Sequence, residues 1–343
     1  MVLIRALTFM YVNPPKSSEV VEVVNGVVSK LSEVGLTPWT VRVTISSNDV
    51  GEELLKWLCT SKYLFSTYQT SVEDLNYEYL RNVMKCPNSF ASILLKDYSG
   101  VDEAVDVLLN LVRTYGYDVA TRLGFAIGDY VETPYYPLST AFRDGVSIAL
   151  RYVDTYASAL ATEDPEVRIA STLKKVSDLV SHSVKSAGVD YLGVDASISP
   201  WMEESVVPLI EKLSKIKFPK PGSASGLKKL NDLIVKSVEL ANIPTLGFNE
   251  VMLPVGEDLT LMNLVRTNEL KLSDLTFLTA YCLVGVDMVA LPADRNLIKG
   301  VFNDVLAAYE VKKRSLGIRL IPVEESLQEV HIARFGSIPV IRS

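Results

Sequence analysis

Short apolar runs alternate with longer amphipathic stretches along this chain, and this alternation restricts the fold more than any other feature of the sequence. The runs VLIRALTF (2–9) and WTVRVTI (39–45) are rich in β-branched and large apolar residues, which is typical of buried strands. Between them, residues 17–35 repeat apolar side chains at three- and four-residue spacing, with Ser18 as the predicted N-terminal cap and Gly35 as the predicted end. This opening predicts a strand, a helix and a second strand.

The same alternation continues through the rest of the sequence. It predicts further strands in ASILLKDY, DYLGVDASISP, GVDMVALP and IRLIPV, and helices over 51–60, 74–85, 101–115, 163–187, 203–215, 227–241 and 296–313. Strands with near-continuous apolar runs between helices favour a mainly parallel sheet covered by helices. No Pro/Ser-rich linker divides the chain, so we expect one α/β domain over residues 1–343, with its site on loops at the carboxyl ends of strands.

Charge and composition exclude several classes of function. The net charge is −7, from 41 acidic and 34 basic residues, so binding to nucleic acid is not expected. No stretch approaches the roughly 18 apolar residues of a membrane-spanning helix, and no signal peptide is recognised, so a cytoplasmic protein without membrane contact is expected. Cys59, Cys86 and Cys282 are widely spaced, which predicts no disulfide, and His182 and His331 alone argue against a histidine-rich zinc site.

Two polar segments follow or precede predicted elements and are candidate sites. Asp195 comes directly after a strand, where it could bind a metal, an amine or a hydroxyl group, and Ser197 adds a donor; the alternative is a capped turn. Ser223, in PGSASGLKK, lies at a helix start that suits a phosphate or carboxylate, although the spacing does not match a Walker A loop. The alternative there is an ordinary flexible entry to the helix.

Carboxylates cluster around two apolar runs in the second half of the chain. In GFNEVMLPVGED, the residues Glu250, Glu257 and Asp258 could hold Mg²⁺ or Ca²⁺ or act as an acid/base pair, unless they cap the next helix. Asp287 lies inside an apolar strand, where a carboxylate is unfavourable unless it is paired, and Asp294 follows that strand. For Cys282, just before this strand, we expect a packed thiol and not a nucleophile.

A long aromatic segment, GDYVETPYYPLSTAFRDG (128–145), is bounded by prolines. Tyr135, Tyr136 and Arg143 in it could stack on and clamp a small anionic ligand. The alternative is a surface loop that packs its own aromatic side chains.

Four stretches together resemble a known family over about residues 185–325. The stretches are GVDASISP, FPKPGSASGLKKLNDLI, GFNEVMLPVGED and YCLVGVDMVALPAD. They resemble motifs that occur in the same order in uncharacterised protein family 0210, also called domain of unknown function family 711. Ala293 stands where that family usually has glycine, and the weaker likeness of the first half indicates an archaeal-type branch. The resemblance implies a ten-stranded α/β barrel with helices outside, like that of pyruvate formate-lyase and anaerobic ribonucleotide reductase. It implies no activity, because the family has none established.

The C-terminal segment HIARFGSIPVIRS departs from the glycyl radical motif of those barrel enzymes. Gly336 follows Arg334 by two residues and not three, and Ser337 replaces the aromatic residue, so radical chemistry is not expected.

These observations predict an enzyme that acts on a small polar or anionic metabolite at a carboxylate-rich site in the mouth of a barrel, with Mg²⁺ or Ca²⁺ as the expected ion. The alternative is a non-catalytic metabolite-binding or regulatory protein. For the assembly we expect a homo-oligomer. A common site would require Asp195, Glu250 and Asp287 to meet in one cavity. The assigned roles are catalytic for Asp195, Asp287 and Glu257; substrate-binding for Ser197, Tyr135, Arg143 and Ser223; and metal-binding for Asp258 and Asp294.

Overall fold

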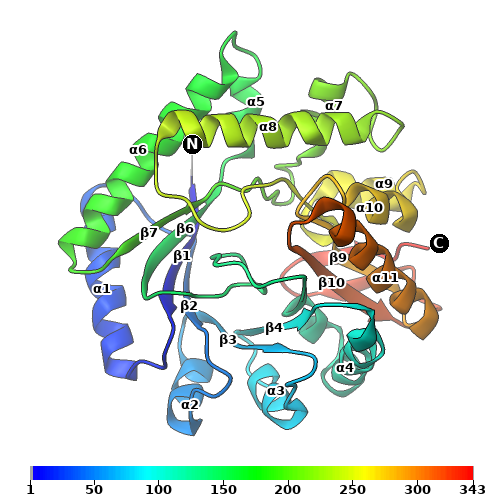
Figure 1. The fold of residues 1–343 in the computed structure, drawn as a ribbon, viewed down its shortest axis with the longest axis horizontal. Coiled ribbons are helices and arrows are strands. Elements are labelled where there is room, and N and C mark those ends of the chain that lie inside the picture. Colours follow the sequence, from blue (N-terminus) through cyan, green and yellow to red (C-terminus); the bar gives the residue numbers. More distant parts are fainter. Residues whose placement is uncertain (1–2, 343) are drawn as a thin grey trace.

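Ten strands form one sheet in the computed structural model, which describes residues 3–342 (Figure 1). Their order is β7-β6-β1-β2-β3-β4-β5-β10-β9-β8. Neighbours are parallel except at β1–β6 and β5–β10, so the expected mainly parallel sheet is confirmed, with two antiparallel joints. The strands are β1 (Leu3–Tyr11), β2 (Thr40–Ile45), β3 (Leu64–Ser71), β4 (Ser89–Leu95), β5 (Leu123–Ile127), β6 (Gly145–Arg151), β7 (Tyr191–Asp195), β8 (Met252–Pro254), β9 (Val284–Pro292) and β10 (Leu316–Val323). A separate hairpin pairs β11 (Glu329–Ile332) with β12 (Gly336–Pro339).

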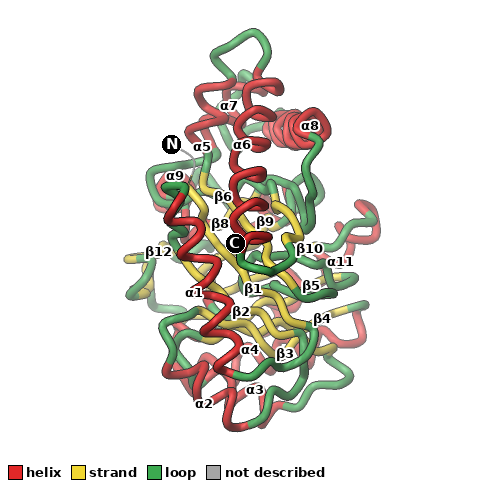
Figure 2. The backbone as a smooth tube through the Cα atoms, turned by 90° about the vertical axis from the view of Figure 1, so that its left-hand side faces the viewer, coloured by secondary structure: helices red, strands yellow, loops and turns green. Residues whose placement is uncertain are grey.

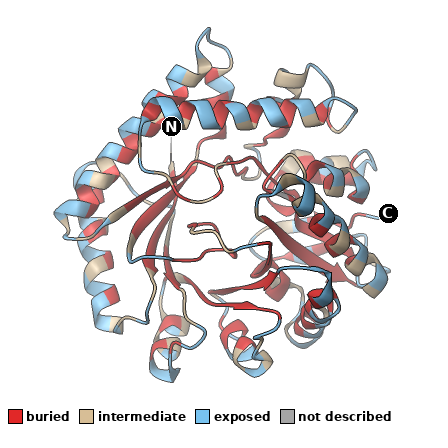
Figure 3. Cartoon of the chain, in the orientation of Figure 1, coloured by how far each residue is buried: buried red, intermediate tan, exposed pale blue. Residues whose placement is uncertain are grey.

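Helices cover the outside of this sheet, as Figure 2 shows from a second side. They are α1 (Ser17–Glu33), α2 (Glu52–Thr60), α3 (Tyr77–Met84), α4 (Val101–Tyr115), α5 (Val153–Ala159), α6 (Pro165–Ser186), α7 (Val207–Ser214), α8 (Ser223–Ala241), α9 (Leu259–Arg266), α10 (Leu272–Leu278) and α11 (Arg295–Lys312), with short 3₁₀ turns at Tyr98–Gly100, Tyr117–Thr121 and Val255–Glu257. Figure 3 shows the reason for the periodicity, because the long helices have a buried face toward the rest of the protein and an exposed face outward. Within residues 3–342, no helix is both long and apolar enough to cross a membrane.

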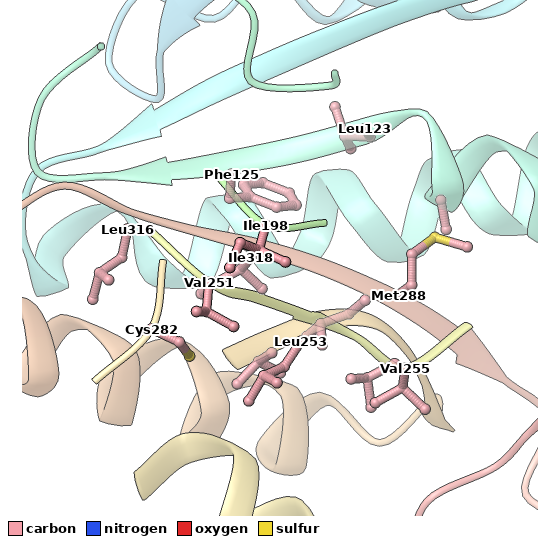
Figure 4. Packing of buried hydrophobic residues seen from close by; sticks show 14 of the residues in the cluster. Leu123, Phe125, Ile198, Val251, Leu253, Val255, Cys282, Met288, Leu316 and Ile318 are labelled. Atoms are coloured by element: carbon pink, nitrogen blue, oxygen red, sulfur yellow. The ribbon is translucent and has the colours of Figure 1, made fainter. Parts of the chain in front are cut away.

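The main hydrophobic core lies between the sheet and the helices. Figure 4 shows part of it, with Phe125 of β5, Ile318 of β10 and Cys282 among the buried side chains. Phe125 stacks edge-on against Phe302 of α11, with ring centroids 4.9 Å apart. Cys282 is fully buried, and burial raises the pKa of its thiol to about 12, which agrees with the expected packed thiol.

Two local predictions are wrong. The first turn of α1 is capped at Lys16, and Ser18 lies inside the helix, because Glu19 accepts the Lys16 backbone N–H and fixes the start there. The disulfide expectation also fails, since Cys59 and Cys86 are bonded, with Cα atoms 5.1 Å apart. Cys59 lies near the end of α2, before β3, and Cys86 follows the end of α3, before β4. Because β3 and β4 are parallel neighbours, these two helix ends lie side by side, and the spacing of the cysteines in sequence does not reveal that proximity.

The two edges of the sheet lie next to each other. Val194 of β7 pairs with Thr245 and Ile198 pairs with Val251, both as isolated parallel bridges. The backbone N–H groups of Leu246 and Met252 donate to the carbonyls of Val194 and Ile198 at 3.2 and 2.9 Å. Between the two bridges the pairing is interrupted, and the buried carboxylate of Asp195 lies in the gap.

Candidate functional site

A cavity of about 290 Å³ opens on the inner face of the sheet. Its walls come from the amino ends of β1 to β4, from the segments that follow β7 and β8, from β9 and β10, and from the turn of the β11–β12 hairpin. The site was expected at the carboxyl ends of strands, and only β7 and β8 contribute to the cavity in that way. The antiparallel joints explain the difference, because they bring amino ends and carboxyl ends to the same rim of the sheet.

Three arginines inside apolar strands supply most of the charge in the cavity. Arg5 of β1, Arg42 of β2 and Arg319 of β10 are all buried. A buried guanidinium needs partners for its donors, so the contacts of each one decide what it can do.

Glu257 lies between two of these arginines. Its Oε2 accepts from Arg5 at 2.6 Å and its Oε1 accepts from Arg319 at 2.8 Å. Burial would raise the pKa of this carboxyl, but the Arg319 and Arg5 guanidinium groups hold the pKa below its ordinary value. Glu257 is therefore a fixed anion in the cavity wall.

Asp287 pairs with Arg319 through both carboxylate oxygens, at 2.6 and 2.9 Å. This confirms that a carboxylate inside the strand GVDMVALP is paired. Burial raises the pKa of Asp287, and the negative charge of Glu257 raises it further, against the opposing effect of Arg319. Both carboxylates contact Arg319, but only Glu257 has a second guanidinium, that of Arg5, so Asp287 takes up a proton more readily.

Arg42 is the buried arginine without a carboxylate partner among residues 3–342. It donates to Thr40 Oγ1 at 3.0 Å and to the Pro134 carbonyl at 3.4 Å, and its guanidinium lies 4.8 Å from the ring centroid of Tyr136. Burial, with a smaller effect from the charge of Arg5, lowers the pKa of Arg42 to about 10. Its positive charge is therefore uncompensated and faces the cavity.

The turn of the β11–β12 hairpin adds a fourth arginine. Arg334 lies over the rings of Phe90 and Phe335, at 5.6 and 5.9 Å from their centroids. Its carboxylate contact is a loose one to Asp118, at 3.8 Å. Asp118 already pairs with Arg122 at 2.9 Å, so the charge of Arg334 is also largely uncompensated.

The segment 128–144 crosses the centre of the curved sheet in Figure 1. Tyr135 in it lines the cavity and donates to the Ser197 carbonyl at 3.2 Å, and Tyr136 donates to the Val43 carbonyl at 2.8 Å. Gly124 of β5 makes room for the tip, because a Cβ there would lie 2.6 Å from Pro137. The middle of the segment is thus interior, whereas its end at Phe142 and Arg143 lies at the surface.

Asp195 is fully buried but does not line the cavity. Its carboxylate accepts from the hydroxyls of Ser197 and Thr133 at 2.6 and 2.8 Å, and from the backbone N–H groups of Phe248 and Asn249 at 3.1 and 3.2 Å. Burial raises the pKa of Asp195 despite these donors. Asp195 and Ser197 therefore hold the two sheet edges together at the point where their pairing is interrupted.

The other predicted site residues lie away from the cavity. Arg143 is exposed and pairs with Glu132, and the Ser223 hydroxyl donates to the Lys220 carbonyl within the entry to α8. Glu250 pairs with Lys312 and Arg314. Asp195, Glu250 and Asp287 thus do not meet in one cavity, since only Asp287 lines it.

Asp258 and Asp294 each cap a helix start. Asp258 accepts from the N–H groups of Thr260 and Leu261 at α9, and burial raises its pKa. Asp294 does the same at α11. No group of three metal-ligating side chains occurs within residues 3–342.

The cavity residues that sequence reasoning missed are the arginines and the aromatic side chains around them. Trp39 and Trp201 stack edge-on at 4.7 Å, and the Arg5 guanidinium lies 5.8 and 5.4 Å from their rings. Arg5, Arg42 and Arg319 each interrupt an apolar run, as Asp287 does, so the same burial argument applied to positive charges identifies them.

Comparison with known proteins gives one family. The model of the family described as Uncharacterised ACR (DUF711) matches residues 147–328. The chain is 33% identical over 178 residues to a UPF0210 protein of Desulforudis audaxviator, covering 50% of this chain and 39% of the relative. It is 30% identical over 162 residues to one of Bifidobacterium adolescentis (46% and 36%) and 30% over 161 residues to UPF0210 protein MJ1665 of Methanocaldococcus jannaschii (46% and 35%).

These matches span less than two fifths of each of those relatives. The relatives include bacterial proteins, so they do not assign the chain to an archaeal branch.

Proposed function

Because this chain belongs to the family described as Uncharacterised ACR (DUF711), whose relatives carry names without an activity, we propose its function from the cavity itself. The protein is an enzyme that binds a small anionic metabolite in the cavity and moves a proton on it. The observation that carries the proposal is the uncompensated charge of Arg42, a buried guanidinium in a cavity lined largely by aromatic side chains.

An anion is the ligand that such a wall favours. Burying a cation without a partner is unfavourable, and a carboxylate or phosphate beside Arg42 relieves this through charge-assisted hydrogen bonds. The aromatic rings of Phe90 and Tyr136, with centroids 4.9 Å apart, provide an apolar surface for the rest of the ligand.

Proton transfer is supported by the unequal carboxyl pair. Glu257 stays ionised between two arginines, whereas the raised pKa of Asp287 lets it hold or release a proton nearer to neutral pH. Pairs of acids whose environments push their pKa values apart are typical of acid/base sites. Asp287 is the proton carrier in this proposal, and Glu257 fixes Arg319 beside it.

A divalent ion does not fit the carboxylates of this cavity. Glu257 and Asp287 are already paired with guanidinium groups, and the four arginines that line the cavity repel Mg²⁺ or Ca²⁺. The expected carboxylate-rich metal site is therefore replaced in the proposal by an arginine-rich anion site.

The sheet closes into a barrel in the same proposal. The bridges of β7 to residues 245 and 251 support closure, and ten strands with two antiparallel joints agree with the pyruvate formate-lyase-like fold expected from the family resemblance. The spacing of Gly336 from Arg334 gives no reason to add a radical step.

The proposal is tested in two steps with the full chain. A thermal-shift screen of anionic and neutral metabolites identifies ligands, and turnover assays follow on each hit. The Asp287→Asn variant should lose roughly 100- to 10,000-fold in turnover, the usual contribution of a general acid or base, while still binding the ligand.

Asp294→Asn is the matched control, since Asp294 follows the same strand but caps α11 outside the cavity. Its turnover should equal that of the unmodified chain. A ligand that binds tightly and is never consumed would favour the second candidate function, a non-catalytic metabolite-binding or regulatory protein. Stabilisation by neutral metabolites alone would contradict the anion site.

A further inference from the structure

The charges that line the cavity do not balance. Arg5, Arg42, Arg319 and Arg334 face it, against the two carboxylates of Glu257 and Asp287. Two positive charges therefore remain. The imbalance is the same when the adjoining Arg122–Asp118 pair is included, because that pair is neutral by itself.

The two surplus charges come from different parts of the cavity wall, since Arg42 belongs to β2 and Arg334 to the turn of the β11–β12 hairpin. Arg5 binds Oε2 of Glu257, and burial together with the charge of Arg5 lowers the pKa of Arg42. Arg319 binds Oε1 of Glu257, and burial together with the charges of Arg122 and Arg319 lowers the pKa of Arg334. The surplus charge is thus divided between β2 and the hairpin turn, and it is not concentrated at one point of the cavity.

An apolar surface connects the two surplus arginines. The Arg42 guanidinium lies 4.8 Å from the Tyr136 ring centroid, and the Tyr136 and Phe90 centroids are 4.9 Å apart. The Arg334 guanidinium lies 5.6 Å from the Phe90 centroid. A ligand that contacts both arginines must therefore pass over a pair of aromatic rings.

We propose that the cavity takes a dianion, a small molecule with two separate acidic groups joined by an apolar body, with one group on Arg42 and the other on Arg334. This deepens the proposed function and rests on it. Two negative charges neutralise the surplus, each oxyanion can receive both donors of a guanidinium fork, and the apolar body covers Tyr136 and Phe90. Since Arg334 belongs to the hairpin turn, the ligand also connects the hairpin to the sheet.

Calorimetric titration of the full chain tests this with straight-chain dicarboxylates of increasing length, each beside the monocarboxylate of equal carbon number. A phosphonocarboxylate of each length distinguishes two carboxylates from a carboxylate with a phosphate group. At one chain length, the dianion should bind roughly 10- to 100-fold more tightly than the monoanion, since one further charge-assisted contact has about that effect.

Variants locate the two ends of the ligand. Arg42→Met and Arg334→Met should each reduce the affinity for the dianion to that of the monoanion. Arg334 is partly exposed in its turn, so Arg334→Met gives a folded protein even if Arg42→Met does not. Arg143→Met is the matched control, because Arg143 is an exposed arginine paired with Glu132, and it should change neither affinity.

Equal affinity for monoanion and dianion at every length, or dianion binding unchanged in Arg334→Met, overturns the dianion while the anion site remains. Binding of neither series at millimolar concentration overturns the dianion too. The metabolite screen then decides the proposed function separately, because a different anion that binds would preserve it.

Discussion

At the scale of single residues, the informative positions are charges that interrupt apolar strands. Asp287 and Arg319 are such positions on neighbouring strands, where each one provides the partner that the other requires. Arg42 interrupts its strand in the same way and finds an aromatic ring and backbone carbonyl instead of a carboxylate. The difference separates a charge that stabilises the fold from one that is available to a ligand.

The first prediction concerns the acid stability that Glu257 provides. Because Arg319 and Arg5 outweigh burial and lower its pKa, the stabilising contribution of Glu257 is complete above about pH 4.3, the unfolded value. It is lost as the pH falls through the lowered folded-state pKa. Glu257→Gln should destabilise the protein by about 3–5 kcal/mol at pH 7, and the gap should close on acidification, as measured by urea unfolding across a pH series.

Glu204→Gln provides the comparison for this prediction. Glu204 pairs with Arg151 at 2.8 Å, but both side chains are partly exposed, so the loss should be only about 1 kcal/mol. A gap for Glu257→Gln that stays constant down to pH 2 would mean that the carboxylate contributes no ionic stabilisation.

Residue-level reasoning from sequence predicted part of this site. It identified Asp287, Glu257 and Tyr135, which line the cavity. It gave Asp195 a catalytic role from its position after a strand, but a position in sequence does not show how many local donors a carboxylate will receive. Five hydrogen bonds saturate Asp195, two from Ser197 in its own turn and three from other segments of the chain.

At the scale of elements, the segment 128–144 shows why a long loop can act as core. Thr133 and Thr140 pair within it, and Ser139 donates to the Thr133 carbonyl, so the loop satisfies its own backbone while it enters the molecule. Its aromatic tip then fills space that strands alone would leave open.

Proteolysis tests this interior position. Chymotrypsin should cleave the native protein after Phe142, which is 59% exposed, and should leave the bond after Tyr135, which is 7% exposed, intact. Mass spectrometry of the fragments gives the result, and the urea-unfolded chain is the control in which both bonds are cut. Cleavage after Tyr135 at the rate of Phe142 in the native protein would show that the loop is not packed.

Element prediction succeeded where periodicity is strong, and it missed the strands β3, β5 and β6, of which β5 and β6 are mainly apolar. The helix predicted over 101–115 matches α4 residue for residue. Strand β3 was missed because LFSTYQTS has few apolar residues, although all but its first residue are buried. Its polar side chains face the interior and are satisfied there, as Gln69 is by Ser66, and no sequence period reveals such pairing.

At the scale of the whole molecule, the contact between the two edges of the sheet depends on the buried carboxylate of Asp195. Gly247 has a φ of +80°, and a Cβ at this position would lie 1.9 Å from Asp195 Oδ2. Gly247→Ala should therefore both strain the backbone and displace Asp195, with a loss of about 3 kcal/mol or more in unfolding free energy, measured by urea denaturation.

Gly35→Ala separates the two effects. Gly35 has a similar φ of +74° but no atom within 4 Å of the added Cβ, so its loss should be the backbone strain alone, about 1 kcal/mol. Equal losses for the two variants would show that Asp195 does not hold the edges together.

The residues that line the cavity belong partly to the region that the family model matches and partly to the rest of the chain. Glu257, Asp287 and Arg319 lie within the matched residues 147–328, whereas Arg42 and Arg334 lie outside them. In our proposal the proton-carrying carboxyl belongs to the first group, and the two ligand-binding arginines belong to the second.

The residues that line the cavity are far apart in sequence, from Arg5 to Phe335, so they are synthesised at different times during translation. Translation from the N-terminus produces Arg5 and Arg42 long before Glu257, and Arg334 after it. Until Glu257 and Asp287 have been synthesised, Arg5 has no carboxylate of the cavity beside it. A nascent chain therefore carries no complete ligand site until the hairpin turn with Arg334 has been synthesised.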